Sequence, residues 1–197
     1  MKRVTEMKFK FTIQPYQTEA VDSVVGVFAG QPFNDHFTYR RDVEIRRDVT
    51  NWMLSDEELY MGFANAKVQL DSGQLLENIR RIQTRNNIKL SDSLKSGGLG
   101  VCSLDVEMET GTGKTYVYIK TMFELNKLYG WSKFIVVVPS IAIREGVRKS
   151  FETMQEHFME YYGKKARFFV YNSKNLPDID NYSQSADINV MIINIQA

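Results

Sequence analysis

The chain has 197 residues, of which 43% are hydrophobic and 25% charged, and its formal net charge is +1. This is the composition of a folded globular protein, and the near-zero charge gives no sign of nucleic-acid binding by the surface as a whole. No apolar run approaches the roughly 20 residues of a membrane span, and the first residues lack the apolar core of a signal peptide. The single cysteine, Cys102, has no disulfide partner within the chain, so we expect a cytoplasmic protein with no membrane association.

Two helices are predicted before residue 100. Pro15 at an N-terminal position, followed by apolar residues at helical spacing, predicts a helix from Tyr16 to Phe28. The sequence GQLLENIRRIQTR predicts an amphipathic helix over 74–86. Before the first helix, the alternation of Phe9, Phe11 and Ile13 fits a short strand or an extended arm.

The remaining segments of this half are less regular. The stretch TYRRDVEIRRDV fits a solvated strand and a solvated helix equally well, and residues 31–72 match no motif. The composition of SDSLKSGGLG predicts a loop over 91–100.

From residue 101 onward, strands and helices alternate. Predicted strands are VCSLDVEM (101–108), KFIVVVP (133–139), ARFFVYN (166–172) and INVMIINI (188–195), and predicted helices cover 114–128 and 141–161. The run FIVVVP is apolar on both faces, which is typical of a buried parallel strand rather than an edge strand. The alternation predicts an α/β fold with a parallel sheet flanked by helices.

The glycine-rich stretch METGTGKT (108–115) carries the strongest chemical signal. Gly111 and Gly113 let backbone N–H groups approach phosphate oxygens without a Cβ in the way. Lys114 would meet the β- and γ-phosphates, and the hydroxyl of Thr115 would bind Mg²⁺. The full pattern has glycine in the first position, where this chain has Met108. The alternative is a glycine-rich turn without a ligand, but a predicted strand before it and a helix after it favour a nucleotide site.

Two weaker signals flank this stretch. In IQPYQ, the side-chain amide of Gln17 can pair with an adenine edge, although by itself it fits a helix-surface residue equally. In VVVPS, Ser140 at the start of a helix can contact a phosphate of a nucleic-acid backbone. It can equally be an ordinary N-cap, with Glu145 nearby in a weak capping role.

Taken in order, these motifs resemble the first lobe of superfamily 2 helicases and translocases. FTIQPYQTEAV, GQLLENIRRIQ, LDVEMETGTGKTYVYIKTMFEL, KFIVVVPSIAIREGV and INVMIINIQA resemble more specifically the N-terminal part of the Res subunits of type III restriction enzymes. The resemblance covers roughly 9–29 and 73–197, and that family tolerates Met108.

The resemblance implies a RecA-like P-loop NTPase lobe, incomplete at the C-terminus, with an N-terminal region over 1–100 and the first part of the lobe over 101–197. It implies a DNA-dependent ATPase and translocase that uses ATP and Mg²⁺, acts on double-stranded DNA and works with a modification (methyltransferase) subunit. A separate nuclease domain, absent from this sequence, would make the cut. The implied residues are, for nucleotide and Mg²⁺, Gln17, Thr110, Gly111, Thr112, Gly113, Lys114 and Thr115, and for DNA, Pro139, Ser140, Arg144, Asn194 and Gln196, with Lys114 and Thr115 in the catalytic role.

One motif of the family is missing from this sequence. Motif II, the Asp-Glu pair that holds Mg²⁺ and positions the attacking water, does not occur, since the only Asp-Glu, Asp56-Glu57, precedes the glycine-rich stretch. Phosphoryl transfer depends on such groups, so we expect the chain by itself to bind ATP without hydrolysing it. Two alternatives stay open: a superfamily 2 helicase without a nuclease, and a truncated, non-catalytic module that binds ATP or a partner.

Other candidate residues have structural explanations. Cys102 is expected to be a small buried residue rather than a nucleophile, and His36 and His157 lack metal-ligand spacing. The aromatic cluster is expected to be core rather than a base-stacking platform; its members are Phe158, Tyr161, Tyr162, Phe168, Phe169 and Tyr171.

Overall fold

A computed structural model describes residues 11–34, 37–40, 61–98, 100–174 and 176–195. Its helices are α1 (Pro15–Gly26), α3 (Ser72–Arg85), α4 (Lys114–Tyr129), α5 (Ile141–Tyr162) and α6 (Leu176–Gln184). Its strands are β1 (Phe37–Arg40), β2 (Met61–Ala64), β3 (Lys133–Val138), β4 (Arg167–Val170) and β5 (Asn189–Asn194).

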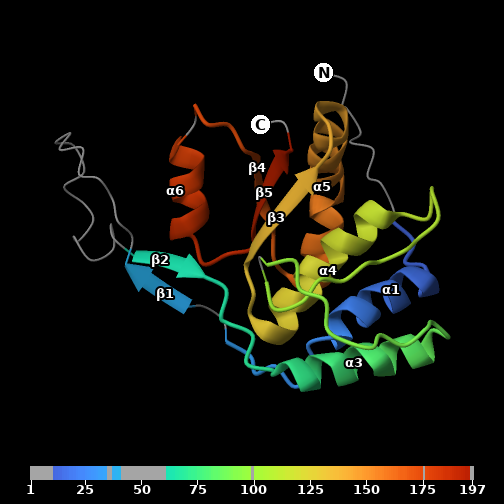
Figure 1. Ribbon diagram of the computed structural model, residues 1–197. Coiled ribbons are helices and arrows are strands. Elements are labelled where there is room, and N and C mark those ends of the chain that lie inside the picture. Colours follow the sequence, from blue (N-terminus) through green and yellow to red (C-terminus); the bar gives the residue numbers. More distant parts are fainter. Residues whose placement is uncertain (1–10, 35–36, 41–60, 99, 175, 196–197) are drawn as a thin grey trace.

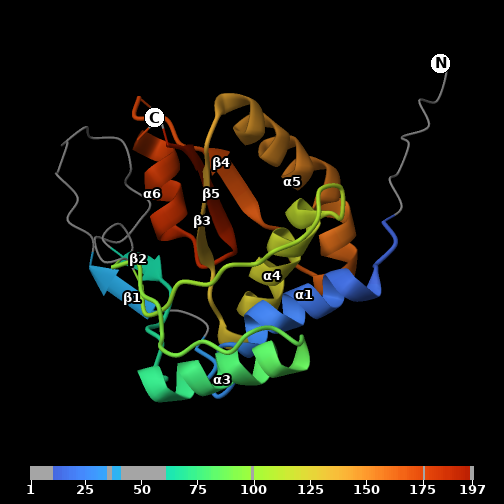
Figure 2. The ribbon, with the colours of Figure 1, turned by 45° about the vertical axis from the view of Figure 1, so that its right-hand side comes forward.

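A parallel sheet of three strands, in the order β3-β5-β4, organises the second half of the chain. The register pairs Val136 with Ile192 and Ile192 with Val170. Helix α5 returns the chain from the end of β3 to the start of β4, as parallel strands require, and α4 and α5 lie together against one face (Figures 1 and 2). The prediction of an α/β fold with a parallel sheet is confirmed.

The main core lies between this face and the two helices. Val190 and Ile192 of β5 are fully buried, and they pack in one cluster with Ile119 of α4 and with Phe151 and Phe158 of α5. Burying an aliphatic or aromatic side chain of this size contributes about 1.5–3 kcal/mol, so this cluster fixes α4 against the sheet. The position of α4 matters because its first residue directly follows the glycine-rich stretch.

A second layer joins the N-terminal helices to α4. Val21 of α1 is fully buried and clusters with Val117 and Trp131, so α1 packs along α4. The buried side chain of Asn78 in α3 donates to the carbonyl oxygens of Val27 at 3.0 Å and Ala29 at 2.9 Å. These bonds satisfy carbonyls after the end of α1 and hold α3 beside it (Figure 2).

The first half also contains a short antiparallel pair, β1 and β2. β1 begins one residue before TYRRDVEIRRDV and includes its first three residues, so the start of that stretch is a strand, while residues 41–60 lie outside the described residues. Phe11 to Gln14 have no regular structure, and Phe9 also lies outside. No helix in the described part of the chain is long and apolar enough to span a membrane.

Two strand predictions are wrong. Residues 101–108 form an irregular segment rather than a strand, and the N–H of Ser103 donates to the carbonyl of Lys95, in a loop, at 2.8 Å. The alternation of polar and apolar residues in this segment suits a strand, but the segment finds no partner strand among the described residues. β3 is parallel, as predicted, but it lies at the edge of the described sheet, with Ile135 55% and Val137 61% exposed, because β5 takes the central place.

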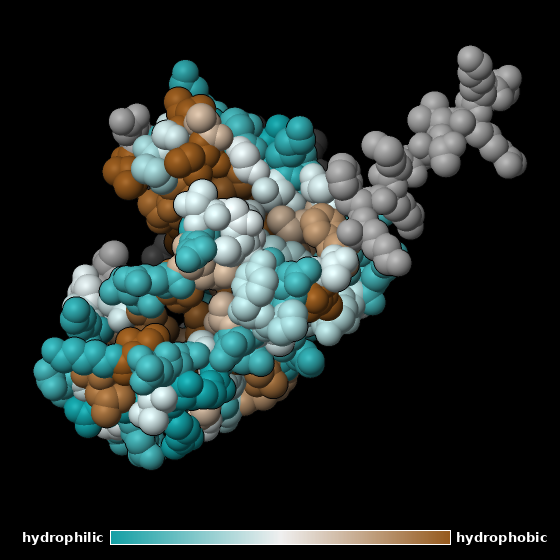
Figure 3. All heavy atoms as spheres, turned by 90° about the vertical axis from the view of Figure 1, so that its right-hand side faces the viewer, coloured by the Kyte–Doolittle hydropathy of each residue, from teal (hydrophilic) through white to brown (hydrophobic). Residues whose placement is uncertain are grey.

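The other boundaries agree to within a few residues, and α6 was not predicted. Figure 3 shows apolar surface gathered at the height where β3 and β5 end, while the α3 end is more hydrophilic. The exposed apolar residues in the turns and helix start at that edge are Ile141, Ile143 and Ile195.

Candidate functional site

The glycine-rich stretch forms a turn that ends in α4. Gly111 and Gly113 both have positive φ, of 85° and 88°, a conformation that only glycine adopts without strain. Gly113 is the N-cap of α4, and no side chain in the described part of the chain caps this helix end. Uncapped N–H groups and the positive end of the helix dipole are the features that bind an anion.

Lys114 folds back over the turn. Its ammonium group donates to the main-chain carbonyl of Met108 and, at 2.9 Å, to that of Glu109. The hydroxyl of Thr112 donates to the same Glu109 carbonyl at 2.6 Å. The carbonyls therefore hold the ammonium at the turn, within reach of any anion that the α4 N-terminus binds.

Helix α1 covers the other side of the turn. Gln17, only 9% exposed, donates from Nε2 to the carbonyl oxygen of Thr112 at 3.0 Å, and the hydroxyl of Tyr16 donates to the same oxygen at 3.2 Å. A Cβ placed on Gly113 would lie 2.5 Å from Nε2 of Gln17. Glycine at 113 is therefore favoured by its φ, and any larger residue there would have to displace the Gln17 amide.

The structure thus brings together Gln17 and the glycine-rich stretch, which are almost one hundred residues apart in the chain. The donor set at the turn, namely backbone N–H groups and an ammonium, fits a polyphosphate. For Mg²⁺, the described residues contain no group of three or more His, Cys, Asp or Glu side chains that could hold an ion. Tyr16 was missed from the sequence, where its position next to Gln17 was the available signal.

Just inside α4, Tyr116 links this helix to α5. Its hydroxyl lies 3.2 Å from Nε2 of His157, and the ring of Phe11 lies 5.1 Å from the His157 ring. Burial, with Lys120 close by, lowers the pKa of His157 and outweighs the attraction of Glu160. His157 therefore serves as a neutral packing residue.

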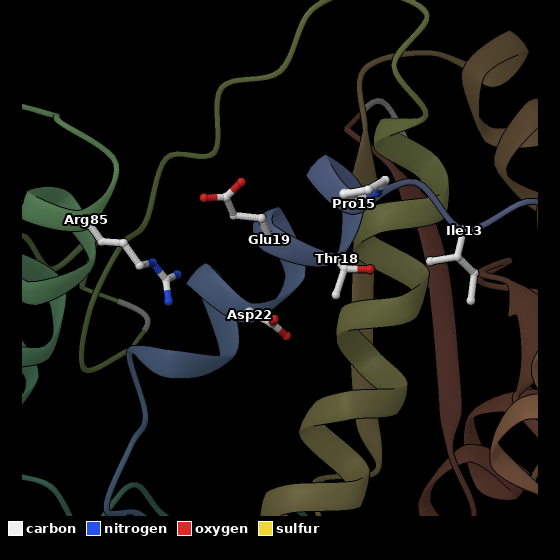
Figure 4. Close-up of a pocket in the computed structure, with 6 residues that line it drawn as sticks. All are labelled: Ile13, Pro15, Thr18, Glu19, Asp22 and Arg85. Carbon is white, nitrogen blue, oxygen red and sulfur yellow. The ribbon is translucent and has the colours of Figure 1, made fainter.

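A surface cavity lies beside this site rather than in it. It has a volume of about 470 Å³ and is lined by Ile13, Pro15, Thr18, Glu19, Asp22 and Arg85. Figure 4 shows Glu19 of α1 and Arg85 of α3 on opposite sides of this space. Neither Gln17 nor a residue of the glycine-rich stretch lines it, so it is not the anion site described above.

Four of the five predicted DNA-binding residues lie at the edge where β3 and β5 end. Arg144 donates from Nη1 to Oδ1 of Asn194 at 3.1 Å, and Asn194 is only 5% exposed. The hydroxyl of Ser140 accepts from Ile143 N at 3.3 Å, which is N-cap geometry. Pro139 is exposed in the turn before α5, and Gln196 lies outside the described residues.

Glu145 does not cap the helix. Its carboxylate accepts hydrogen bonds from Arg144 and Arg148 instead. The three-residue spacing on α5 makes Glu145 and Arg148 neighbours on the helix surface, and the long side chain of the preceding residue, Arg144, reaches the same carboxylate. The capping alternative for Glu145 is therefore wrong.

Three further sequence interpretations are informative. Burial raises the pKa of the half-buried Cys102 thiol, which opposes a role as a nucleophile. The aromatic cluster belongs largely to the core, since Phe158 is 2% exposed and both Tyr162 and Phe168 pack against the main core cluster. Tyr161 is the exception, with 56% of its surface exposed. His36 lies outside the described residues.

The parallel sheet, its covering helices and the glycine turn into α4 define a RecA-like α/β domain. The family model for "Type III restriction enzyme, res subunit" matches residues 75–197, and the chain belongs to this family. The resemblance identified from the sequence motifs is confirmed.

Individual relatives agree with the family match. The chain is 33% identical over 169 residues to the Res subunit of the type III restriction-modification enzyme EcoP15I from Escherichia coli, covering 83% of this chain. It is 32% identical over 162 residues to the EcoPI Res subunit from Escherichia phage P1, covering 81% of this chain. A shorter match, 50% over 62 residues, links it to the StyLTI Res subunit of Salmonella typhimurium and covers 30% of this chain and 6% of that protein. The chain spans 15% and 14% of the lengths of the first two relatives.

Proposed function

We propose that this chain is the ATP-binding N-terminal part of a DNA-dependent ATPase and translocase of a type III restriction-modification system. The complete protein would couple ATP hydrolysis to movement along double-stranded DNA. It would work with a modification (methyltransferase) subunit, and a nuclease domain outside this sequence would cut the DNA. The observation that supports this most is the convergence of Gln17, the positive-φ glycines and Lys114 at the start of α4.

The triphosphate of ATP is the ligand that suits this turn. Backbone N–H groups from Thr110 to Thr115 would surround the phosphates, and the hydroxyl of Thr115 would bind Mg²⁺ together with the nucleotide. Lys114 would exchange two neutral carbonyl acceptors for phosphate oxygens. The phosphate oxygens carry negative charge and the carbonyl oxygens do not, so the Coulomb attraction of the ammonium to phosphate favours this exchange.

Gln17 would select the base. Its amide can both donate and accept, as the edge of adenine requires, and it already lies against the turn that would hold the phosphates. In the chain without nucleotide, the amide is engaged with the Thr112 carbonyl, so binding of adenine requires it to turn.

DNA binding is assigned to the edge where β3 and β5 end. Pro139, Ser140, Arg144, Asn194 and Gln196 would lie along the DNA backbone there, which fits a helix N-terminus and an arginine. Such contacts carry no sequence information, so recognition of a specific site would fall to the modification subunit.

A nucleotide-binding assay tests the first half of this proposal. Binding of a fluorescent ATP analogue to the 197-residue chain in the presence of Mg²⁺ should weaken by tenfold or more in Lys114→Ala. Lys127→Ala, near the other end of α4, is the matched control and should bind like the wild type. Equal affinity in Lys114→Ala and wild type would overturn the nucleotide site.

Base selectivity is tested by competition with unlabelled ATP and GTP. Gln17→Ala should bring the two inhibition constants together, because the amide that distinguishes the bases is lost. A preference for ATP that survives in Gln17→Ala would remove Gln17 from the base site while leaving the phosphate site intact. With no motif II in this sequence, we expect binding without turnover, measured as phosphate release.

A further inference from the structure

Two arginines in the first half of α5 share one carboxylate. Oε1 of Glu145 accepts from Arg144 Nη2 at 3.2 Å and Nε at 3.3 Å, and its Oε2 accepts from Arg148 Nε at 3.1 Å. The hydrogen bonds from Arg148 and Arg144 hold the pKa of Glu145 below its usual range, so the carboxylate stays charged. An anion therefore already lies between the two guanidinium groups.

Arg144 is fixed from a second direction. Its Nη1 donates to Oδ1 of Asn194 at 3.1 Å, and Asn194 is almost fully buried at the end of β5. The end of β5 and the start of α5 lie at the same edge of the sheet (Figure 1). The side chain of Arg144 is accordingly only 21% exposed, compared with 46% for Arg148, so its direction is set by the sheet as well as by its own helix.

Glu145 lies in a place that suits a phosphate group. Guanidinium groups bind carboxylate and phosphate oxygens with the same paired N–H geometry. The Glu145 side chain is 47% exposed, and solvent screens ion pairs of that exposure, so the pairing holds the carboxylate only weakly. A phosphodiester of a nucleic-acid backbone carries the same single negative charge and presents two acceptor oxygens, so it can take the place of this exposed carboxylate, whereas the Asn194 contact to Arg144 can remain.

We propose that Arg144 and Arg148 form a two-arginine phosphate site in which Glu145 is a built-in competitor. Asn194 is a positioning residue that aims Arg144, in place of the direct DNA contact assigned to it from sequence. The site takes one phosphate of a nucleic-acid backbone, and Arg148 is a contact that no motif indicated. This inference rests on the proposed function, since it assumes that DNA passes this edge.

The competitor role predicts a gain of affinity when Glu145 loses its charge. Binding of a fluorescein-labelled 20-base-pair duplex to the whole 197-residue chain, followed by anisotropy at low salt, should become about three- to fivefold tighter in Glu145→Gln. The plot of log affinity against log salt should steepen by up to about 1, because one more phosphate is neutralised. Glu145→Ala should behave in the same way and serves as a second removal of the carboxylate.

Glu152→Gln is the matched control. Glu152 accepts from Arg148 Nη1 at 2.6 Å and not, among the described residues, from Arg144; loss of its charge changes the net charge by the same amount. A general charge effect would tighten binding equally in Glu145→Gln and Glu152→Gln, and that result would overturn the competitor role. Absence of binding by both the wild type and Glu145→Gln would overturn it as well.

The roles of Arg148 and Asn194 have separate tests. Arg148→Ala should weaken binding and make the salt dependence shallower by about 1. Asn194→Ala should weaken binding in the wild type but not in an Arg144→Ala background, and additive losses would overturn the positioning role. If neither Arg144→Ala nor Arg148→Ala changes DNA affinity, the proposed DNA edge itself is wrong. If Arg144→Ala and Arg148→Ala both weaken binding but Glu145→Gln binds like Glu152→Gln, the two-arginine site stands and only the competitor role of Glu145 is overturned.

Discussion

The side-chain amide of Gln17 donates to the main-chain carbonyl of Thr112 at 3.0 Å, across 95 positions of sequence. The same amide nitrogen fills the space where a Cβ on Gly113 would stand. One contact thus sets the distance between α1 and the turn that precedes α4. The first prediction concerns this contact.

Gly113→Ala should destabilise the chain and abolish nucleotide binding. The left-handed φ costs an alanine about 1–2 kcal/mol, and the new Cβ would displace Gln17. Urea unfolding and the fluorescent-ATP assay measure the two effects. Gly111→Ala is the control, because Gly111 has nearly the same φ but open space around it. This variant should show the cost of the backbone conformation without a clash. If Gly113→Ala and Gly111→Ala lower the free energy of unfolding equally, the contact with Gln17 does not contribute to stability.

Asn78→Ala should lower the free energy of unfolding by about 2–3 kcal/mol. The change leaves the carbonyls of Val27 and Ala29 without their buried donor. Each unpaired buried carbonyl costs about 1–3 kcal/mol, and a water molecule that hydrogen-bonds to a carbonyl would reduce this cost. Chemical denaturation measures it. Gln83→Ala is the control, because Gln83 lies on the same helix, α3, and its side chain contacts Ser91 in the loop that follows. Its loss should lower the free energy of unfolding by under about 1 kcal/mol. A smaller loss in Asn78→Ala than in Gln83→Ala would contradict this account.

Lys133→Met should loosen α6 from the sheet. The ammonium of Lys133 donates to the carbonyls of Tyr182 and Ser185, at and just after the C-terminal end of α6. Hydrogen bonds to charged groups contribute about 1.5–3 kcal/mol, so amide hydrogens of α6 should exchange faster in the variant. Lys165→Met, an exposed lysine before β4, is the comparison. Unchanged exchange in α6 would show that other contacts hold it.

Acidification should destabilise the chain through His157. Its pKa in the folded state is below the ordinary value of 6.5, so between these two values the unfolded chain binds more protons than the folded chain. The free energy of unfolding should therefore fall as the pH drops below 6.5 and level off below the folded pKa. His157→Gln can keep a hydrogen bond to Tyr116 without titrating, and it should remove this part of the pH dependence. Identical slopes for variant and wild type between pH 7.5 and 5 would exclude His157 as the cause.

The sequence by itself determined most of the local structure and predicted the residues of the nucleotide site. Apolar spacing placed α1, α3, α4 and α5 and the strands β3, β4 and β5 close to their observed limits, because such periodicity records which side of an element is buried. The glycines, lysine and threonine of GTGKT were recognisable because a phosphate turn needs those residue types next to one another.

Only the tertiary structure decided which elements become neighbours. Periodicity shows that FIVVV is apolar on both faces, but β5 rather than β3 took the central place in the described sheet. Likewise, the pairing of Gln17 with Thr112, of Asn78 with the end of α1 and of Arg144 with Asn194 joins residues 50 or more positions apart. A polar side chain is satisfied by whichever group the packed fold brings within about 3 Å, and one sequence does not encode that choice in its local pattern.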